Sequence, residues 1–155
     1  KSLTSKDWTY ISENKKLSMQ FMKSFKHKIN WERFSVSQEI TLEIASEFEE
    51  YIRWDLLSQY QKLSENFIEQ FEGFLHWSSI SSYQSLSYEF LIKFEKRVLW
   101  SLYFAYQEPD YRNMKKFIFN TNYKNLNFVK TNKLTDQEKQ EIEKLLKLKH
   151  MFEIN

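Results

Sequence analysis

The sequence of 155 residues has no cysteine, one glycine (Gly73) and one proline (Pro109). The absence of cysteine excludes disulfide frameworks, thiolate zinc sites and thiol nucleophiles. Glycine supplies the positive φ that hairpin turns and phosphate-binding loops require. A single glycine therefore excludes a P-loop or a G-x-G-x-x-G motif, and it argues against β-sandwiches and barrels.

Long hydrophobic runs are also missing. No apolar stretch approaches the roughly 18 residues that a membrane-spanning helix needs, and no apolar region of a secretory signal is present. With no cysteine to indicate an oxidising compartment, we expect a cytoplasmic protein.

Aromatic residues are abundant, at 18% of the chain, and 28% of the residues are charged. This composition is typical of a packed domain rather than a disordered chain, and the length fits one domain. All five tryptophans lie 23 residues apart, at Trp8, Trp31, Trp54, Trp77 and Trp100. The constant spacing predicts a tandem repeat with these tryptophans in its core.

Other positions follow the same period of 23 residues. A serine stands four residues after each of the first four tryptophans, and a second hydroxyl residue follows an apolar residue later in the unit. The first set is Ser12, Ser35, Ser58 and Ser81, and the second is Ser18, Thr41, Ser64 and Ser87.

The third unit, residues 54–76, indicates the local structure of one repeat. Ser64 is a suitable N-cap because its hydroxyl can accept from free N–H groups of the first helical turn. Leu63 and Ile68 have the spacing of a hydrophobic staple, and Phe67 and Phe71 continue an apolar helical stripe. We expect one or two α or 3₁₀ turns after each tryptophan, then a link of about five residues and a helix of about ten.

The pattern breaks down towards the C-terminus. Pro109 and Asp110 replace the Leu-Ser pair of the fifth unit, and Asp110 is a reasonable N-cap for a helix from about Tyr111 to Asn120. Thr135 and Glu138 have the spacing of a capping box, which predicts a last, highly charged helix.

One 23-residue unit cannot bury its apolar stripe alone, so neighbouring units must stack and share a core. The sequence thus predicts an all-α, short helical-repeat solenoid of about five units with a charged C-terminal capping helix. We expect a single domain over 1–155, with tandem repeats over 1–122 and a divergent cap over 123–155.

The pattern W-x-x-I-S-x-x-Q-x-L-S-x-x-F-I-x-x-F, present here as WSSISSYQSLSYEFLIKF with Leu91 in place of the second isoleucine, resembles tandem short repeats in proteins of giant viruses and bacteriophages. The resemblance covers roughly residues 8–120, and it implies a helical-repeat fold with an interaction role and no assigned chemistry. In size and composition the chain is also similar to small phage anti-defence proteins, which include inhibitors of CRISPR nucleases.

Charge is segregated along the chain. The net charge is +5 over residues 1–30, −6 over residues 31–99 and +3 over residues 100–155. The acidic residues of the middle segment form either a solvated helix surface or a surface that docks on a basic partner. We expect Leu42, Tyr88 and Ile92 to be exposed on their helices, and they are candidate anchors because exposed apolar groups beside carboxylates often form interface hot spots. The candidate partner-binding residues are Glu39, Leu42, Glu43, Glu47, Glu49, Glu50, Glu69, Glu72, Tyr88 and Ile92.

No catalytic set stands out. His27, His76 and His150 are far apart in the sequence, and the repeated serines have no histidine partner at a fixed spacing. We expect no enzymatic activity, no cofactor and no metal site.

These features favour a non-enzymatic protein-binding module. The leading hypothesis is a phage or mobile-element inhibitor of a host defence nuclease, acting sterically on a Cas9-like effector in the cytoplasm of the infected cell. The first alternative is a nucleic-acid-binding protein that uses Lys15, Lys16, Lys23, Lys26 and Lys28. The second is a viral structural or scaffolding repeat protein.

Overall fold

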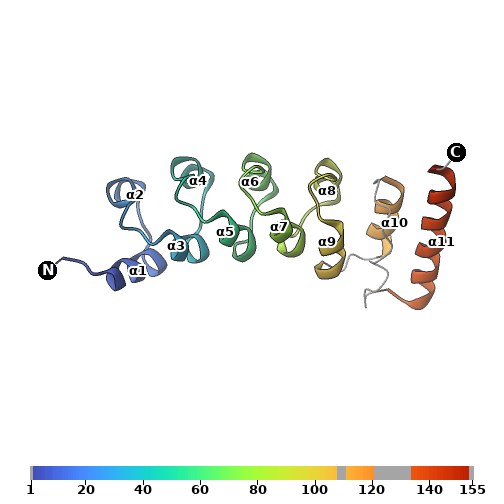
Figure 1. Ribbon diagram of the computed structural model, residues 1–155, viewed down its shortest axis with the longest axis horizontal. Helices are drawn as coiled ribbons and strands as arrows, with labels where there is room; N and C mark the ends of the chain where they lie inside the picture. Colours follow the sequence, from blue (N-terminus) through green and yellow to red (C-terminus); the bar gives the residue numbers. More distant parts are fainter. Residues whose placement is uncertain (1, 108–110, 121–133, 154–155) are drawn as a thin grey trace. The chain divides into compact units, whose positions relative to one another are not determined.

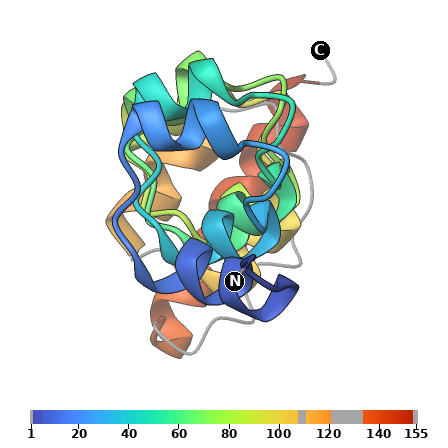
Figure 2. The same ribbon diagram turned by 90° about the vertical axis from the view of Figure 1, so that its left-hand side faces the viewer.

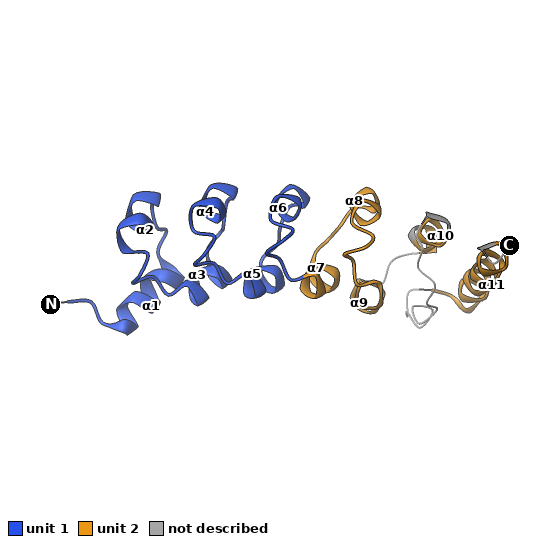
Figure 3. Ribbon diagram, turned by 45° about the horizontal axis from the view of Figure 1, so that its top comes forward, with its two compact units in different colours: residues 1–76 blue, residues 77–155 orange. Residues whose placement is uncertain are grey.

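The computed structural model describes residues 2–107, 111–120 and 134–153. Over these residues the chain forms eleven α-helices and no β-strand, so the all-α class is confirmed. Contacts divide the chain into two compact units, residues 1–76 (unit 1) and residues 77–155 (unit 2), which Figure 3 shows in different colours.

Unit 1 consists of six helices in two rows. The helices are α1 (Ser5–Asn14), α2 (Met19–Phe25), α3 (Trp31–Ser37), α4 (Leu42–Glu47), α5 (Trp54–Tyr60) and α6 (Glu65–Gln70). Helices α1, α3 and α5 form one row and α2, α4 and α6 form the other (Figure 1). Figure 2 views the unit with α1 and α2 nearest the reader. Helix α3 contacts both α1 and α5, so its row is continuous.

Hydroxyl caps start the helices of the second row, as predicted. The backbone N–H of Phe67 donates to Ser64 Oγ at 3.2 Å, and that of Ile44 donates to Thr41 Oγ1 at 3.3 Å. Ser18 caps α2 in the same way. Each hydroxyl satisfies a donor that the first helical turn leaves without a backbone partner.

The second-row helices are shorter than the expected ten residues. Helices α4 and α6 have six residues each. The backbone leaves the helical region at Phe48 and Phe71. The next carbonyl after Phe48, that of Glu49, accepts a hydrogen bond from the indole N–H of Trp54 at 3.0 Å. A tryptophan of the following helix pair thus takes up a carbonyl that a longer helix would have used.

Buried serines join the start and end of each helix pair. Ser58 is fully buried, and its hydroxyl donates to the carbonyl of Trp54 at 2.6 Å while it accepts from the backbone N–H of His76 at 3.1 Å. The same acceptor role recurs at a spacing of 18 residues in Ser12 with Asn30, Ser35 with Arg53 and, in unit 2, Ser81 with Leu99.

Replacing Ser58 with alanine is expected to lower the free energy of unfolding by about 1–3 kcal/mol, because the N–H of His76 loses its acceptor at a part-buried position. Ser37 provides a matched control, since its exposed hydroxyl donates only within its own helix, to the carbonyl of Arg33. Ser37→Ala should change stability by less than about 0.5 kcal/mol. Urea denaturation followed by circular dichroism measures both, and equal losses would contradict the role of the buried serine.

Glutamine side chains link successive helix pairs. Gln38 Nε2 donates to the carbonyl of Glu13 at 2.8 Å, and Gln61 Nε2 donates to the carbonyls of Ser35 and Gln38. These glutamines are 23 residues apart in the sequence. Each side chain occupies carbonyls near the C-terminal end of the preceding first-row helix, which the helix itself leaves unsatisfied.

The tryptophans are core residues at three of the five positions. Trp31, Trp54 and Trp100 are buried, whereas Trp8 and Trp77 are half-buried, so the expectation that all five are core was wrong for two of them. Trp8 lies in α1, the first helix of unit 1, where no earlier described helix pair covers it.

Unit 2 contains the remaining described helices. They are α7 (Trp77–Tyr83), α8 (Tyr88–Lys93), α9 (Trp100–Tyr106), α10 (Tyr111–Asn120) and α11 (Asp136–Glu153). Helix α7 contacts α9, and α10 contacts α11. The capping box is confirmed, since Thr135 N donates to Glu138 Oε2 at 2.8 Å and Glu138 N donates to Thr135 Oγ1 at 3.2 Å. The predicted cap at Asp110 and the start of the predicted C-terminal segment, residues 123–133, lie outside the described residues.

Candidate protein-binding surface

Seven glutamates of unit 1 make up the acidic part of the predicted site. Residues 31–76 hold ten acidic and three basic residues, a net charge of −7. Most of the seven are exposed, and Glu72 is half-buried. We call this set the acidic surface; its members are Glu39, Glu43, Glu47, Glu49, Glu50, Glu69 and Glu72.

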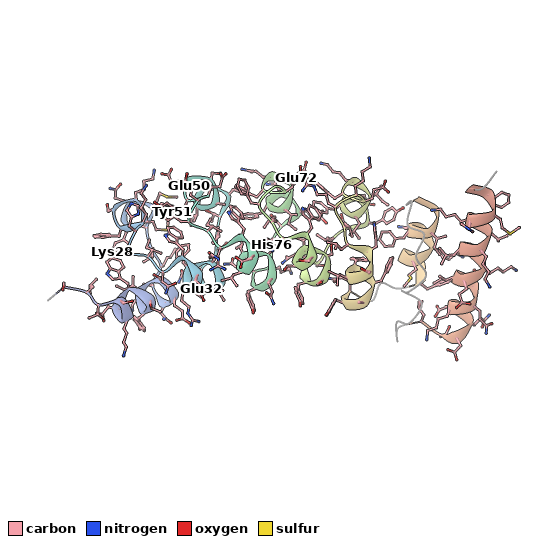
Figure 4. All side chains as sticks on the ribbon, in the orientation of Figure 1. Lys28, Glu32, Glu50, Tyr51, Glu72 and His76 are labelled. Carbon is pink, nitrogen blue, oxygen red and sulfur yellow. The ribbon has the colours of Figure 1, made fainter. Side chains whose placement is uncertain are left out.

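Helix α4 and the turn after it position most of these carboxylates. Glu43 lies in the first turn of α4 behind its Thr41 cap, where the partial positive charge of the helix N-terminus favours a carboxylate. Glu49 and Glu50 follow the end of α4. Figure 4 shows Glu50 and Glu72 on the side of unit 1 formed by α4 and α6.

One member of the acidic surface pairs with a lysine. Lys23 Nζ lies 3.1 Å from Glu47 Oε2 and joins α2 to α4. Both side chains are more than two-fifths exposed, so this ion pair contributes at most about 1 kcal/mol to stability. The pair lowers the negative charge that Glu47 offers to a partner.

The predicted apolar anchors are less accessible than expected. Leu42, Tyr88 and Ile92 are all half-buried, which corrects their assignment as exposed groups. The Tyr88 ring lies 5.3 Å from the ring of Phe117, and its hydroxyl donates to the carbonyl of Lys116 at 3.4 Å. Tyr88 therefore packs α8 against α10. Tyr88 and Ile92 belong to unit 2, whereas Leu42 and the acidic surface belong to unit 1.

The lysines proposed for nucleic-acid binding lie on and around α1 and α2. Lys23 pairs with Glu47, and the ammonium groups of Lys15 and Lys26 lie 5.5 Å from the ring centres of Tyr10 and Tyr51. Lys16 and Lys28 are exposed, and Figure 4 shows Lys28 on the α1–α2 side of unit 1. Three of the five lysines thus already have contacts within unit 1.

Two tyrosines of unit 2 are exposed side by side. Tyr83 and Tyr106 end α7 and α9, are 51% and 59% exposed, and have ring centres 5.8 Å apart. The 23-residue spacing of Tyr60, Tyr83 and Tyr106 is the signal in the sequence that could have indicated this pair.

Two carboxyl groups with lowered pKa values accept hydrogen bonds from neighbouring side chains. The Arg53 guanidinium, hydrogen-bonded to Asp55 at 2.8 and 3.1 Å, holds the pKa of that carboxyl below its usual value. Hydrogen bonds from Tyr111 and Lys115 lower the pKa of Glu141, which ties α10 to α11. The hydrogen bonds that join these residues explain both pKa shifts.

Chemical and membrane sites are not indicated in the part of the chain that the structure describes. There, no group of three or more His, Asp or Glu side chains is arranged to hold a metal ion. None of the helices there has the length and apolar character needed to cross a membrane. His27 contacts Tyr51, with 3.4 Å between the ring Nδ1 and the hydroxyl, and lies far in sequence from His76.

Comparisons with known proteins add no relative. No family model, curated protein or solved structure matches the sequence.

Proposed function

We propose that the chain is a short-repeat helical solenoid of about five 23-residue units that binds another protein through its acidic surface. The recurring serine and tryptophan hydrogen bonds support the repeat, because the donor and acceptor of each recur 23 residues further along. The observation that carries the binding role is the net charge of −7 over residues 31–76, with its carboxylates mostly exposed on α4, α6 and the turns after them.

The partner that this charge fits is the basic nucleic-acid groove of a host defence nuclease, such as a Cas9-type effector. A nuclease groove must be positively charged because it binds phosphates. A negative protein surface is attracted to the same groove, associates rapidly and excludes the nucleic acid sterically. No catalytic step is needed, and the proposed inhibitor works at a stoichiometric ratio in the cytoplasm.

Reversing three exposed charges tests this surface. In the variant Glu43→Lys, Glu49→Lys and Glu50→Lys we expect inhibition of DNA cleavage by a purified Cas9–guide RNA complex to weaken at least about tenfold. Glu47 is left unchanged so that its ion pair with Lys23 persists. The measurement is the concentration of the protein that halves the cleavage rate.

A control variant with the same net charge separates the surface from the overall charge. Glu13, Glu89 and Glu143 are exposed on α1, α8 and α11, and reversing these three should leave inhibition unchanged. Failure of the unmodified protein to inhibit would reject the nuclease assignment. Equal loss in both variants would reject the acidic surface as the contact.

Nucleic-acid binding remains the second candidate because residues 1–30 carry a net charge of +5. It requires binding of DNA or RNA at low salt with an affinity that falls steeply as salt rises. No binding at low salt would reject this alternative.

A further inference from the structure

The ring of Phe74 is exposed in unit 1, in the turn that follows α6. It stacks on the ring of Trp54, with 5.1 Å between the ring centres and 27° between the ring planes. Phe74 is 43% exposed, so the side of its ring that faces away from Trp54 is accessible. The backbone N–H of Phe74 donates to the carbonyl of Phe71 at 3.0 Å. The ring is therefore held in place before any partner binds, which lowers the entropy cost of binding.

The same arrangement occurs one repeat earlier, at Tyr51. Its ring lies on Trp31, with 5.4 Å between the ring centres, as the ring of Phe74 lies on its own tryptophan. Here the chain itself places basic groups beside the ring. The ammonium group of Lys26 lies 5.5 Å from the ring centre, and Nδ1 of His27 lies 3.4 Å from the hydroxyl. The contact with Lys26 is favourable because the face of an aromatic ring attracts a cation.

Carboxylates stand at the corresponding positions of the next repeat. Glu49 and Glu50 follow Lys26 and His27 by 23 residues, and both are exposed in the turn after α4. A carboxylate gains nothing from the face of an aromatic ring, because that face is itself negative. Among the residues that the structure describes, neither Glu49 nor Phe74 forms an ion pair or a cation–π contact.

Two indole hydrogen bonds show that these positions are equivalent in the folded chain. The indole N–H of Trp31 donates to the carbonyl of Lys26 at 2.8 Å, and that of Trp54 donates to the carbonyl of Glu49 at 3.0 Å. Each tryptophan thus holds the backbone of one of these residues close to the ring that stacks on it. A side chain at the position of Glu49 can therefore reach the ring of Phe74, as the lysine does one repeat earlier.

Unit 2 shows that a guanidinium group fits on the tryptophan of a repeat. Arg97 follows Phe74 by 23 residues, and its Cζ lies 5.9 Å from the ring centre of Trp77. The repeats before and after Phe74 in the sequence thus each supply a cation to an aromatic ring, from Lys26 and from Arg97. The repeat between them supplies carboxylates instead, so a cation must come from outside to complete the same arrangement.

We propose that Glu49, Glu50 and Phe74 form an arginine site, in which an arginine side chain of the protein partner lies on the ring and donates to the carboxylates. This proposal rests on the proposed function and names the group that the acidic surface binds. A guanidinium is planar, so it can stack on a ring while its N–H groups reach a carboxylate at the side. An ammonium group has the charge but not the plane, and a phosphate is repelled by both carboxylates.

Binding of an oligoarginine peptide to the intact chain tests the arginine site without a nuclease. A labelled oligolysine peptide of equal length carries the same charge and serves as the comparison. Fluorescence anisotropy at physiological ionic strength measures both affinities. The arginine peptide should bind at least about threefold more tightly than the lysine peptide.

Substitution of the ring should change this preference. Phe74→Leu keeps an apolar side chain on Trp54 and the same net charge, and it should weaken binding of the arginine peptide about three- to tenfold. Phe74→Trp should strengthen binding, because an indole attracts a cation more strongly than a phenyl ring. Phe25→Leu is the matched control, since Phe25 is 41% exposed in α2 and its ring centre lies 5.5 Å from that of Trp8. Circular dichroism checks that each variant is folded.

Glu49→Gln tests the carboxylate without changing the ring. It should weaken binding of the arginine peptide at least about threefold. Glu39→Gln is its control, because Glu39 is an exposed member of the acidic surface and the change in charge is the same. Equal losses in these two variants would show that only the overall charge matters and would overturn the arginine site.

Other outcomes would also overturn the arginine site. They are no binding of the arginine peptide, equal affinity of Phe74→Leu and the unmodified chain, and a loss of the same size in Phe25→Leu. Self-association that Phe74→Leu abolishes, measured by sedimentation velocity, would assign the arginine to a second copy of the chain and overturn its assignment to a partner protein.

The nuclease assay separates the arginine site from the proposed function. Peptide binding that Phe74→Leu weakens, with no inhibition of the Cas9–guide RNA complex by the unmodified protein, would support the arginine site and reject the nuclease as its partner. Equal inhibition by the unmodified protein and by Phe74→Leu would overturn the arginine site and leave the proposed function standing.

Discussion

Deleting residues 31–53 is expected to leave a folded, helical protein, because the deletion removes one whole 23-residue period from unit 1. Trp54 then follows Asn30 directly, in the place of Trp31. Its indole can donate to the carbonyl of Lys26, as the indole of Trp31 does at 2.8 Å. Ser12 keeps Asn30 as its donor at 2.9 Å, and Gln61 takes the place of Gln38.

In a solenoid, stability is approximately the sum of the contributions of single repeats and of the contacts between neighbours. The shortened chain should therefore unfold cooperatively in urea, at a lower midpoint than the full chain. Far-ultraviolet circular dichroism and the urea transition measure this outcome.

A deletion of residues 28–53 is the control, because it removes only three more residues but destroys the period. Trp54 then follows His27, so the chain is too short for the serine and indole hydrogen bonds to form together. We expect loss of the cooperative transition. An unfolded 23-residue deletion would contradict the proposed solenoid, and two equally stable deletions would show that these bonds do not set the register.

Local signals in the sequence predicted local features of the fold. Ser64 and Thr41 cap helices, and Thr135 forms a capping box with Glu138, because each interaction joins residues only three positions apart. The length of the second-row helices could not be predicted from helix propensity alone, because a side chain outside the helical segment takes up the next free carbonyl. The carbonyl after Phe48 is taken by the indole of Trp54, and propensity within residues 42–52 carries no information about that bond.

The same distinction applies to the candidate site. Exposure of the acidic surface could be predicted because glutamate seldom occupies a core without a partner. The half-burial of Tyr88 could not, because α10 covers it from 28 residues away. The contact between the rings of Tyr83 and Tyr106 could not be predicted either, because it becomes visible only when α7 and α9 are known to be neighbours.

Replacing Trp54 with alanine is expected to lower the free energy of unfolding by about 3–5 kcal/mol, the usual loss for a large aromatic residue in a core. Trp54 is buried, and its ring centre lies 5.1 Å from that of Phe74 and 5.2 Å from that of Phe71. Because a domain of this size has a total stability of about 5–15 kcal/mol, the variant should be close to unfolding at physiological temperature.

Two further substitutions separate the causes of this loss. Trp54→Phe keeps an aromatic ring but removes the donor to the carbonyl of Glu49, and it should lose about 1–2 kcal/mol. Trp8→Ala removes a half-buried ring that contacts Phe25 at 5.5 Å, and it should lose less than Trp54→Ala. Urea denaturation gives all three values. Equal losses for Trp8→Ala and Trp54→Ala would contradict this explanation. They would show that each tryptophan stabilises only its own helix pair, and that its contacts with the preceding helix pair contribute nothing.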